Sequence, residues 1–236
     1  MEIFIQQERL RGSLYHLLSK CYQIPGEFLK TEEVVKQLHL FLSENHPRAA
    51  AEAAVMLSVL ESTDDLSPLV QEFLTLFVGP KTLLAPPYGS LYLEDKGQIM
   101  GPSTFEAMKY YEAAGLQKSK TMHEPDDHLR IELEFISYLI GRVLESSESN
   151  RMEAAVKFAQ LQTTFLERHL GNWVHPFANN MENQATSDYF KALARLTILF
   201  VGQDVSQDSK QMLAELQMFA QEDQSSAEKH QSQEIN

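Results

Sequence analysis

Apolar residues recur every three or four positions along most of this chain, which is the spacing of one face of an α-helix. Near the N-terminus this spacing places Leu10, Leu14, Leu17, Leu18 and Cys21 on a common face. The same pattern predicts further helices over residues 31–42, 49–60, 67–79, 103–115, 125–144, 151–171, 187–201 and 207–221. Strand-like patterning is confined to the short piece Ser90–Leu93, so the sequence predicts an all-α fold.

Residues that favour helix ends support several of these boundaries. Thr31 is a suitable N-cap for the second helix. Ser103 and Glu106 have the spacing of a capping box. Near residue 171, His169 and Trp173 are interpreted as a cation and an aromatic side chain that finish a helix.

Proline and glycine interrupt the helical pattern repeatedly between residues 80 and 102, so this segment is predicted to be one long irregular loop. Its aromatic and aliphatic content, including Tyr88, Leu91 and Tyr92, indicates that the loop is ordered. We therefore expect a bundle-like single domain over residues 1–221, with a possible subdivision near 80–125. The polar stretch 222–236 is predicted to be a disordered tail.

The charge of the chain narrows its possible partners. With 236 residues and 43% hydrophobic residues, the composition is that of an ordinary globular protein. The formal net charge of −13 argues against binding to a nucleic-acid backbone, which requires clustered Lys and Arg. It is compatible with a basic partner, although excess acidic residues also serve solubility.

The single cysteine and the N-terminal residues give information on the cellular compartment of the protein. Cys21 alone allows neither an internal disulfide nor a multi-thiolate metal site, which favours a reducing environment. The N-terminal residues Met1–Glu8 have neither the basic nor the apolar region of a secretory signal. No apolar run is long enough to cross a bilayer. We expect a cytoplasmic protein without membrane insertion.

The densest group of functional side chains is the acidic cluster His123–His128, which holds three carboxylates and two imidazoles. Pro125 is interpreted as the first residue of the helix that follows. That start would place Asp126 and Asp127 in the first helical turn, where the helix dipole favours carboxylates. The cluster has no metal-binding spacing such as Glu-x-x-His or His-Glu-x-x-His, so we expect no metal and no cofactor.

A catalytic role for the cluster would use Asp127 and His128 as an acid–base pair. Neighbouring helical residues point about 100° apart, so these two side chains would not face one another. The chain has no nucleophile-elbow motif and no glycine-rich phosphate loop. We therefore expect a protein that is not an enzyme, and keep a helical enzyme as the alternative.

Several motifs, in order, resemble the TorD/DmsD family of chaperones that mature molybdenum-cofactor oxidoreductases. They occur over roughly residues 70–200, and their co-occurrence is more specific than any one of them. They are Phe73–Pro80 with its Phe-x-Gly-Pro turn, Pro87–Tyr92, Tyr111–Leu116, Glu124–Leu129 followed by Glu132–Phe135, and Phe165–Trp173.

The resemblance implies an all-helical chaperone that binds the twin-arginine signal peptide and the catalytic subunit of a molybdopterin oxidoreductase. It implies a peptide-binding site with Asp127 and His128 at its core and Glu124, Asp126, Tyr88 and Ser90 nearby. Carboxylates there would meet the two arginines, because guanidinium groups pair well with carboxylates. A generic peptide-binding scaffold is a further alternative. The motifs do not name the client, and they are compatible with a monomer or a domain-swapped dimer.

Overall fold

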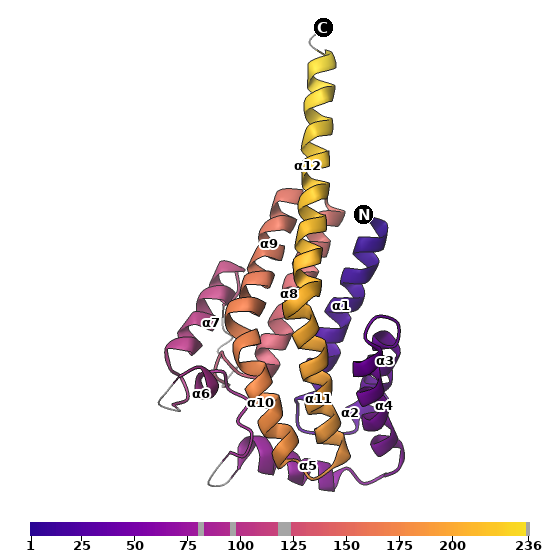
Figure 1. The fold of residues 1–236 in the computed structure, drawn as a ribbon, viewed down its shortest axis with the longest axis vertical. Coiled ribbons are helices and arrows are strands. Elements are labelled where there is room, and N and C mark those ends of the chain that lie inside the picture. The colour runs from indigo at the N-terminus through magenta and orange to yellow at the C-terminus, as the bar shows by residue number, and fades with distance from the viewer. Residues whose placement is uncertain (80–82, 95–97, 118–123, 235–236) are drawn as a thin grey trace.

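A computed structural model describes residues 1–79, 83–94, 98–117 and 124–234, and these residues confirm the all-α fold (Figure 1). The described residues form no β-strand, and the only bridge among them pairs Tyr88 with His128. The N-terminal half comprises α1 (Glu2–Cys21), α2 (Phe28–Thr31), α3 (Val34–Leu42), α4 (Pro47–Glu61), α5 (Ser67–Phe73), the π-helix η1 (Leu74–Val78), α6 (Ser90–Leu93) and α7 (Pro102–Ala113).

The C-terminal half contains the longer helices. It comprises α8 (Leu129–Glu148), α9 (Met152–Phe165), the π-helix η2 (Leu166–Leu170), α10 (Gly171–Gln184), α11 (Asp188–Gln203), the π-helix η3 (Asp204–Asp208) and α12 (Ser209–Glu234). Two continuous columns result, one from α9 through α10 and one from α11 through α12 (Figure 1). None of the described helices combines the length and apolar character needed to cross a bilayer.

Helix packing places the apolar faces predicted from the sequence in one core. Helix α1 packs on α8, α4 on α11, and α10 on α11, while α9 lies between α8 and α12. The largest fully buried side chains are aromatic and include Trp173, Tyr15, Tyr189, Phe165 and Phe177. A smaller apolar cluster joins the outer ends of α1, α8 and α9 to the first half of α12, and consists of Phe4, Val143, Met152, Ala155, Ala159, Met212 and Leu216.

Two of the predicted N-caps are wrong: Thr31 lies at the end of a helix, and a residue outside α7 caps its first turn. The Thr31 hydroxyl donates to the Glu27 carbonyl, so Thr31 ends the short helix α2 and does not begin α3. The first turn of α7 is bound by Glu94, whose carboxylate accepts from the Ser103 N–H at 2.9 Å and the Ser103 hydroxyl at 2.7 Å. Glu94 comes from the preceding segment, which the capping-box pattern does not consider.

The structure also corrects where two elements begin and end. The piece Ser90–Leu93 is the short helix α6, not a strand. The helical column through α9 and α10 does not end near Gly171, because the π-helix η2 continues it. Gly171 serves close packing here: an added Cβ would lie 2.5 Å from the Leu166 carbonyl oxygen and 3.0 Å from Val205.

The structure differs from the prediction for the C-terminal segment as well. Residues 222–234, expected to be disordered, continue α12 as helix, and Figure 1 shows this end projecting beyond the other helices. The segment has no Pro or Gly and is rich in residues that favour helix. Extending an existing helix also avoids the cost of nucleation.

The predicted loop over 80–102 includes residues 80–82 and 95–97, which lie outside the described residues. Its described parts are irregular apart from α6, and they pack against the helices. Ala85 is fully buried, and its N–H donates to the Leu76 carbonyl at 2.9 Å. This packing holds the first part of the loop against η1.

Candidate functional site

Two segments about 40 residues apart in the sequence run antiparallel at the start of α8. The Gly89 N–H donates to the Asp127 carbonyl at 2.9 Å, and the Leu129 N–H donates to the Pro87 carbonyl at 2.9 Å. Between these bonds, Tyr88 and His128 form the bridge. The backbone therefore brings the tyrosine loop, Pro87–Tyr92, next to the acidic cluster, as the resemblance implied.

Asp127 lies at the buried centre of this junction. Its Oδ2 accepts the Ser90 N–H at 2.7 Å, and both Asp127 and Ser90 are fully buried. The Asp127 carboxylate thus caps the start of α6. Asp127 Oδ1 and the Ser90 hydroxyl oxygen, also buried, have no hydrogen-bonding partner among the described residues. Asp127 fixes the loop from inside and does not face solvent.

Helix α8 does not begin at Pro125, which corrects the expected helix start. Pro125–Asp127 form a turn, and His128 is the N-cap, its Nδ1 accepting the Arg130 N–H at 3.1 Å. Asp126 and Asp127 are therefore not in the first helical turn. The pairing with residues 87–89 keeps the backbone extended at His128 and delays the helix by four residues. Burial lowers the pKa of His128 to about 4, which favours the neutral ring that the cap requires.

The exposed edge of the junction consists of Glu124 and Tyr88. The Tyr88 hydroxyl donates to Glu124 Oε2 at 3.3 Å, and the Tyr88 ring meets the His128 ring edge-on, with centroids 5.2 Å apart. Burial, and then the Glu124 charge, raise the pKa of Tyr88 to about 12, so the hydroxyl remains a donor. Glu124 is exposed, whereas Tyr88 and His128 are partly buried. His123, the first residue of the cluster, lies outside the described residues.

A hollow of about 350 Å³ adjoins the cluster on the side of α7. Asp126 is 6% exposed, and its carbonyl accepts the Tyr111 hydroxyl at 2.6 Å, which ties the cluster to α7. The lining comprises Met108, Tyr111, Glu112, Gly115, Leu116, Gln117 and Asp126. One turn before Met108 on α7, Phe105 is 56% exposed. Phe105 and Met108 therefore form an apolar strip on α7 that ends at this hollow.

A buried polar network lies beneath the tyrosine loop, and the sequence analysis missed it. Glu132 Oε1 and His169 Nε2 are 2.8 Å apart, and the Trp173 indole N–H donates to Glu132 Oε2 at 3.1 Å. All three side chains are essentially inaccessible. Tyr92 stacks on Trp173, and an added Cβ at Gly89 would lie 3.0 Å from the indole nitrogen. The network supports the loop from below.

Burial and the attraction between Glu132 and His169 have opposing effects on the pKa values of both groups. Burial raises the pKa of Glu132, although His169 opposes the shift. Burial disfavours protonation of His169, but the charge and hydrogen bond of Glu132 outweigh it and raise the pKa of His169. A signal existed in the sequence: Glu132 occupies an inward position between Leu129 and Leu133 on the apolar face of α8.

The geometry suits recognition of a cation better than catalysis. Asp127 is bound to the Ser90 N–H and His128 to the Arg130 N–H, so the two do not act on one another. The described residues contain no group of three His, Cys, Asp or Glu side chains arranged to hold a metal ion. What the site offers to solvent is the Glu124 carboxylate, the Tyr88 ring and the hollow beside α7.

A known protein family matches the part of the chain that contains this site. The family described as nitrate reductase delta subunit matches residues 32–179. "Chaperone protein TorD" of Vibrio cholerae serotype O1 is 30% identical over 136 residues, which cover 58% of this chain and 60% of the relative. "Probable Tat proofreading chaperone DmsD" of Haemophilus influenzae is 29% identical over 130 residues, covering 55% and 57%.

A third relative matches over more of its length. "Chaperone protein TorD" of Shewanella pealeana is 27% identical over 210 residues, which cover 84% of this chain and 89% of that protein. This chain therefore spans about 60% of the first two relatives and nearly nine-tenths of the third.

Proposed function

This chain belongs to the nitrate reductase delta subunit family, and from that premise we propose that it is a chaperone for a molybdenum-cofactor oxidoreductase. In this role it binds the twin-arginine signal peptide and the apo form of the catalytic subunit in the cytoplasm. It holds them until the cofactor has been inserted and the enzyme is exported. The observation that carries the proposal is that the family match, residues 32–179, contains the whole candidate site. The relatives named as chaperones, not enzymes, support it.

Glu124 is the carboxylate that we expect to meet an arginine of the signal peptide. It is exposed, and the Tyr88 hydroxyl donates to it, which orients the carboxylate without neutralising it. A guanidinium group can bind such a carboxylate with two parallel hydrogen bonds, and the tyrosine ring beside it offers a face for stacking.

For Asp127 we propose a role different from the one that the resemblance implies. Its carboxylate is fully buried and bound to the Ser90 N–H, so direct contact with the peptide would require the loop to open. We assign to Asp127 the task of positioning the segment that carries Tyr88. The negative charge of Asp127 still adds to the field at the edge of the site.

The apolar part of the signal peptide fits the strip that runs from Phe105 along α7 to the hollow beside Asp126. Two charge-assisted hydrogen bonds contribute about 3–6 kcal/mol at most. Association and ordering of the peptide cost about as much or more. Burial of about 400 Å² of apolar peptide surface contributes roughly 10 kcal/mol before those costs. Apolar contacts therefore dominate affinity, and the charges set orientation and specificity.

The proposal is tested by calorimetric titration of the protein with synthetic leaders of molybdenum-cofactor oxidoreductases. For the cognate leader we expect micromolar binding, about −8 kcal/mol. Replacing both arginines by lysine should weaken binding, and scrambling the sequence should abolish it. A leader that keeps both arginines but lacks its apolar run should lose nearly all affinity.

These peptides also separate the alternatives. Equal binding of the scrambled leader would indicate a generic peptide-binding scaffold. Undiminished binding of the leader without its apolar run would contradict the energetic ranking given above. An enzyme using Asp127 and His128 would show turnover that is lost in Asp127→Ala.

A further inference from the structure

Three large apolar side chains are exposed where the chain enters α7. Ile99 is 43% exposed, Met100 62% and Phe105 56%. Exposed apolar side chains that occur singly are ordinary, whereas a group of them on one surface marks a site of contact with another molecule. Ile99, Met100 and Phe105 are called the α7 patch below.

Met100 and Phe105 occupy positions on either side of the first turn of α7. Gly101 is the N-cap of this helix, so Met100 directly precedes the cap and Phe105 is the fourth helical residue. Apolar side chains at these two positions often pack on each other and fix the direction in which the chain enters the helix. Here both side chains are more than half exposed, so such a contact accounts for only part of their surface.

The backbone of Met100 is unfavourable for this residue. Its φ of 67° lies in the left-handed region, which Gly and Asn adopt readily and a residue with a longer side chain does not. The other described non-glycine residues with positive φ, Glu33 and Asn150, are both polar. Folding alone would favour Gly or Asn at position 100. A large, exposed apolar side chain on a strained backbone therefore indicates a functional role.

Contacts from Glu94 hold this turn in place. The Glu94 carboxylate accepts from the Ser103 N–H at 2.9 Å and from the Ser103 hydroxyl at 2.7 Å. It also fills the space that a side chain at Gly101 would need, because an added Cβ there would overlap the carboxylate. The residue that follows Met100 is thus fixed, and Met100 is presented to solvent on a rigid turn.

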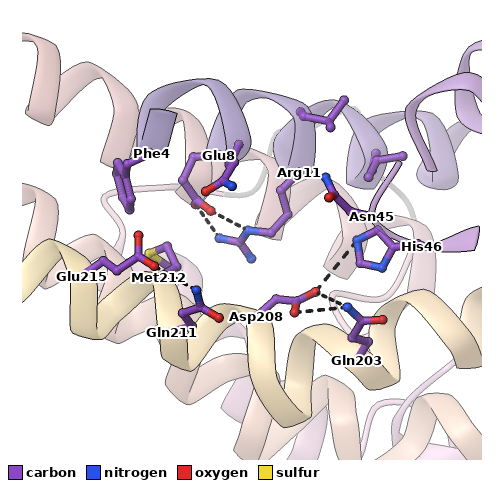
Figure 2. A pocket seen from close by; sticks show the side chains of 13 residues that line it. Phe4, Glu8, Arg11, Asn45, His46, Gln203, Asp208, Gln211, Met212 and Glu215 are labelled. Carbon is purple, nitrogen blue, oxygen red and sulfur yellow. Dashed lines mark hydrogen bonds and ion pairs between the residues drawn. The ribbon is translucent and has the colours of Figure 1, made fainter. Parts of the chain in front are cut away.

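The absence of charge along this stretch limits what can cover it. Gln98–Phe105 contains no charged residue in a chain with a net charge of −13. The cavity between α1 and α12, by contrast, is lined by Glu8, Asp208 and Glu215 (Figure 2). A basic segment would find no carboxylate within the α7 patch. The occupant is therefore uncharged and apolar where it makes contact.

The area of the α7 patch argues against a second copy of this chain. Three large side chains that are about half exposed offer on the order of 300 Å². A stable interface between two proteins requires about 800 Å² from each partner. Two copies that each carry a net charge of −13 would also repel one another. A short apolar peptide segment needs no more area than the α7 patch provides.

We propose that the α7 patch binds the apolar run of the signal peptide and that Met100 is its principal contact residue. This inference rests on the function proposed above and extends that site beyond Phe105. The patch is continuous with the strip of Phe105 and Met108 that ends at the hollow beside Asp126. The unbranched thioether of Met100 adapts to apolar side chains of different shapes, which suits a segment defined by composition and not by exact sequence.

The first test is calorimetric titration of Met100 variants with a synthetic leader that binds the unaltered protein. Asparagine accepts the left-handed backbone but is polar, so Met100→Asn should bind the leader about tenfold more weakly. Met100→Leu keeps an apolar side chain and should stay within about threefold of the unaltered protein. Met218→Asn is the matched control, because Met218 is 61% exposed on α12, and it should not change the affinity. Full affinity in Met100→Asn would overturn the proposal.

Thermal unfolding separates binding from a role in starting the helix. Met100→Gly removes the backbone strain, so its melting temperature should rise by up to about 3 °C while its leader affinity falls. Met218→Gly places glycine inside a helix and should lower the melting temperature by about 2–4 °C without affecting the leader. A lower melting temperature with unchanged leader affinity in Met100→Gly would show that Met100 only stabilises the helix start, and would overturn the proposal.

A third measurement needs no variant that must bind. In protein labelled with ¹³C at the methionine methyl groups, the Met100 resonance should shift when the leader is added and the Met218 resonance should not. The peak missing from the Met100→Leu spectrum assigns Met100. A leader that binds without moving the Met100 resonance would overturn this inference and leave the proposed function standing. No leader binding by the unaltered protein would overturn both, so the two failures are distinguishable.

Discussion

Glu124 and Asp127, only three residues apart, have opposite surroundings. Glu124 is exposed at the edge of the site, where Tyr88 donates to it, and Asp127 is fully buried against the Ser90 N–H. The resemblance implied a site with Asp127 at its core and Glu124 nearby. The sequence could not show that Asp127 is buried, because the segment that buries it comes from a distant part of the chain. We therefore propose that Glu124 contacts the ligand and that Asp127 supports the loop.

This assignment predicts different effects for the two alanine variants. Asp127→Ala leaves the buried Ser90 N–H without an acceptor, so unfolding free energy should fall by about 1–3 kcal/mol. Glu124→Ala should change it by less than about 0.5 kcal/mol, as is usual at the surface, while weakening leader binding about tenfold. Chemical denaturation and calorimetry measure the two quantities. An Asp127→Ala protein of unchanged stability that binds no leader would contradict the assignment.

His128 provides a prediction for pH. Its pKa in the folded protein is about 4, below the ordinary value of 6.5, chiefly because the ring is buried. Between these two values the unfolded chain binds a proton that the folded protein does not, so the contribution of His128 to stability is lost as pH falls from 6.5 to 4. Asparagine can also accept the Arg130 N–H but does not titrate.

The comparison to make is therefore thermal unfolding of the unaltered protein and of His128→Asn between pH 7 and pH 4. The unaltered protein should lose more stability over this range than the variant. Parallel curves would show that titration of His128 does not contribute.

At the scale of elements, the helices were predictable but several of their ends were not. Periodicity located α1, α4 and α11 well, because each places one apolar face on the core. The π-helix η2 was not predictable, since the sequence pattern ended this helix at residue 171. The role of Gly171 depends on the close approach of Val205 from η3, a tertiary contact that local sequence patterns do not contain. The same holds for Glu94, which caps α7 from outside it.

Two glycine-to-alanine variants test this interpretation. In Gly171→Ala the added Cβ meets a backbone carbonyl, so unfolding free energy should fall by about 1–3 kcal/mol. In Gly141→Ala, at an exposed position inside α8, the Cβ meets nothing within 4 Å, and stability should rise by about 0.4–1 kcal/mol. Denaturant unfolding measures both. A Gly171→Ala protein as stable as the unaltered one would mean that η2 adapts without strain.

At the scale of the whole molecule, periodicity predicted an all-α protein but not how its helices stack. The buried network of Glu132, His169 and Trp173 joins α8 to the column of α9 and α10, and only the packed structure reveals it. Among the candidate residues, the proximity of the tyrosine loop to the acidic cluster was implied by resemblance. The burial of the candidate residues was not implied, because the exposure of a side chain depends on the complete packing arrangement.

Helix α12 is expected to divide into two parts with different importance. Its first half contributes Met212 and Leu216 to the apolar cluster around Phe4 and Met152. A chain ending at residue 208 should lose cooperative unfolding or several kcal/mol of stability, because burial of each large apolar side chain contributes about 1.5–3 kcal/mol. A chain ending at residue 221 retains that cluster and should melt within about 2 °C of the full chain. Equal loss in both would place essential contacts beyond residue 221.

The central claim, that this protein binds a twin-arginine signal peptide at the junction of the tyrosine loop and the acidic cluster, is tested most directly by amide hydrogen exchange with and without the cognate leader. Bound leader should slow exchange in residues 84–94, 102–117 and 124–131, and leave α3 and α4 unchanged. Slowed exchange confined to other elements, or none at a leader concentration far above micromolar, would contradict the account.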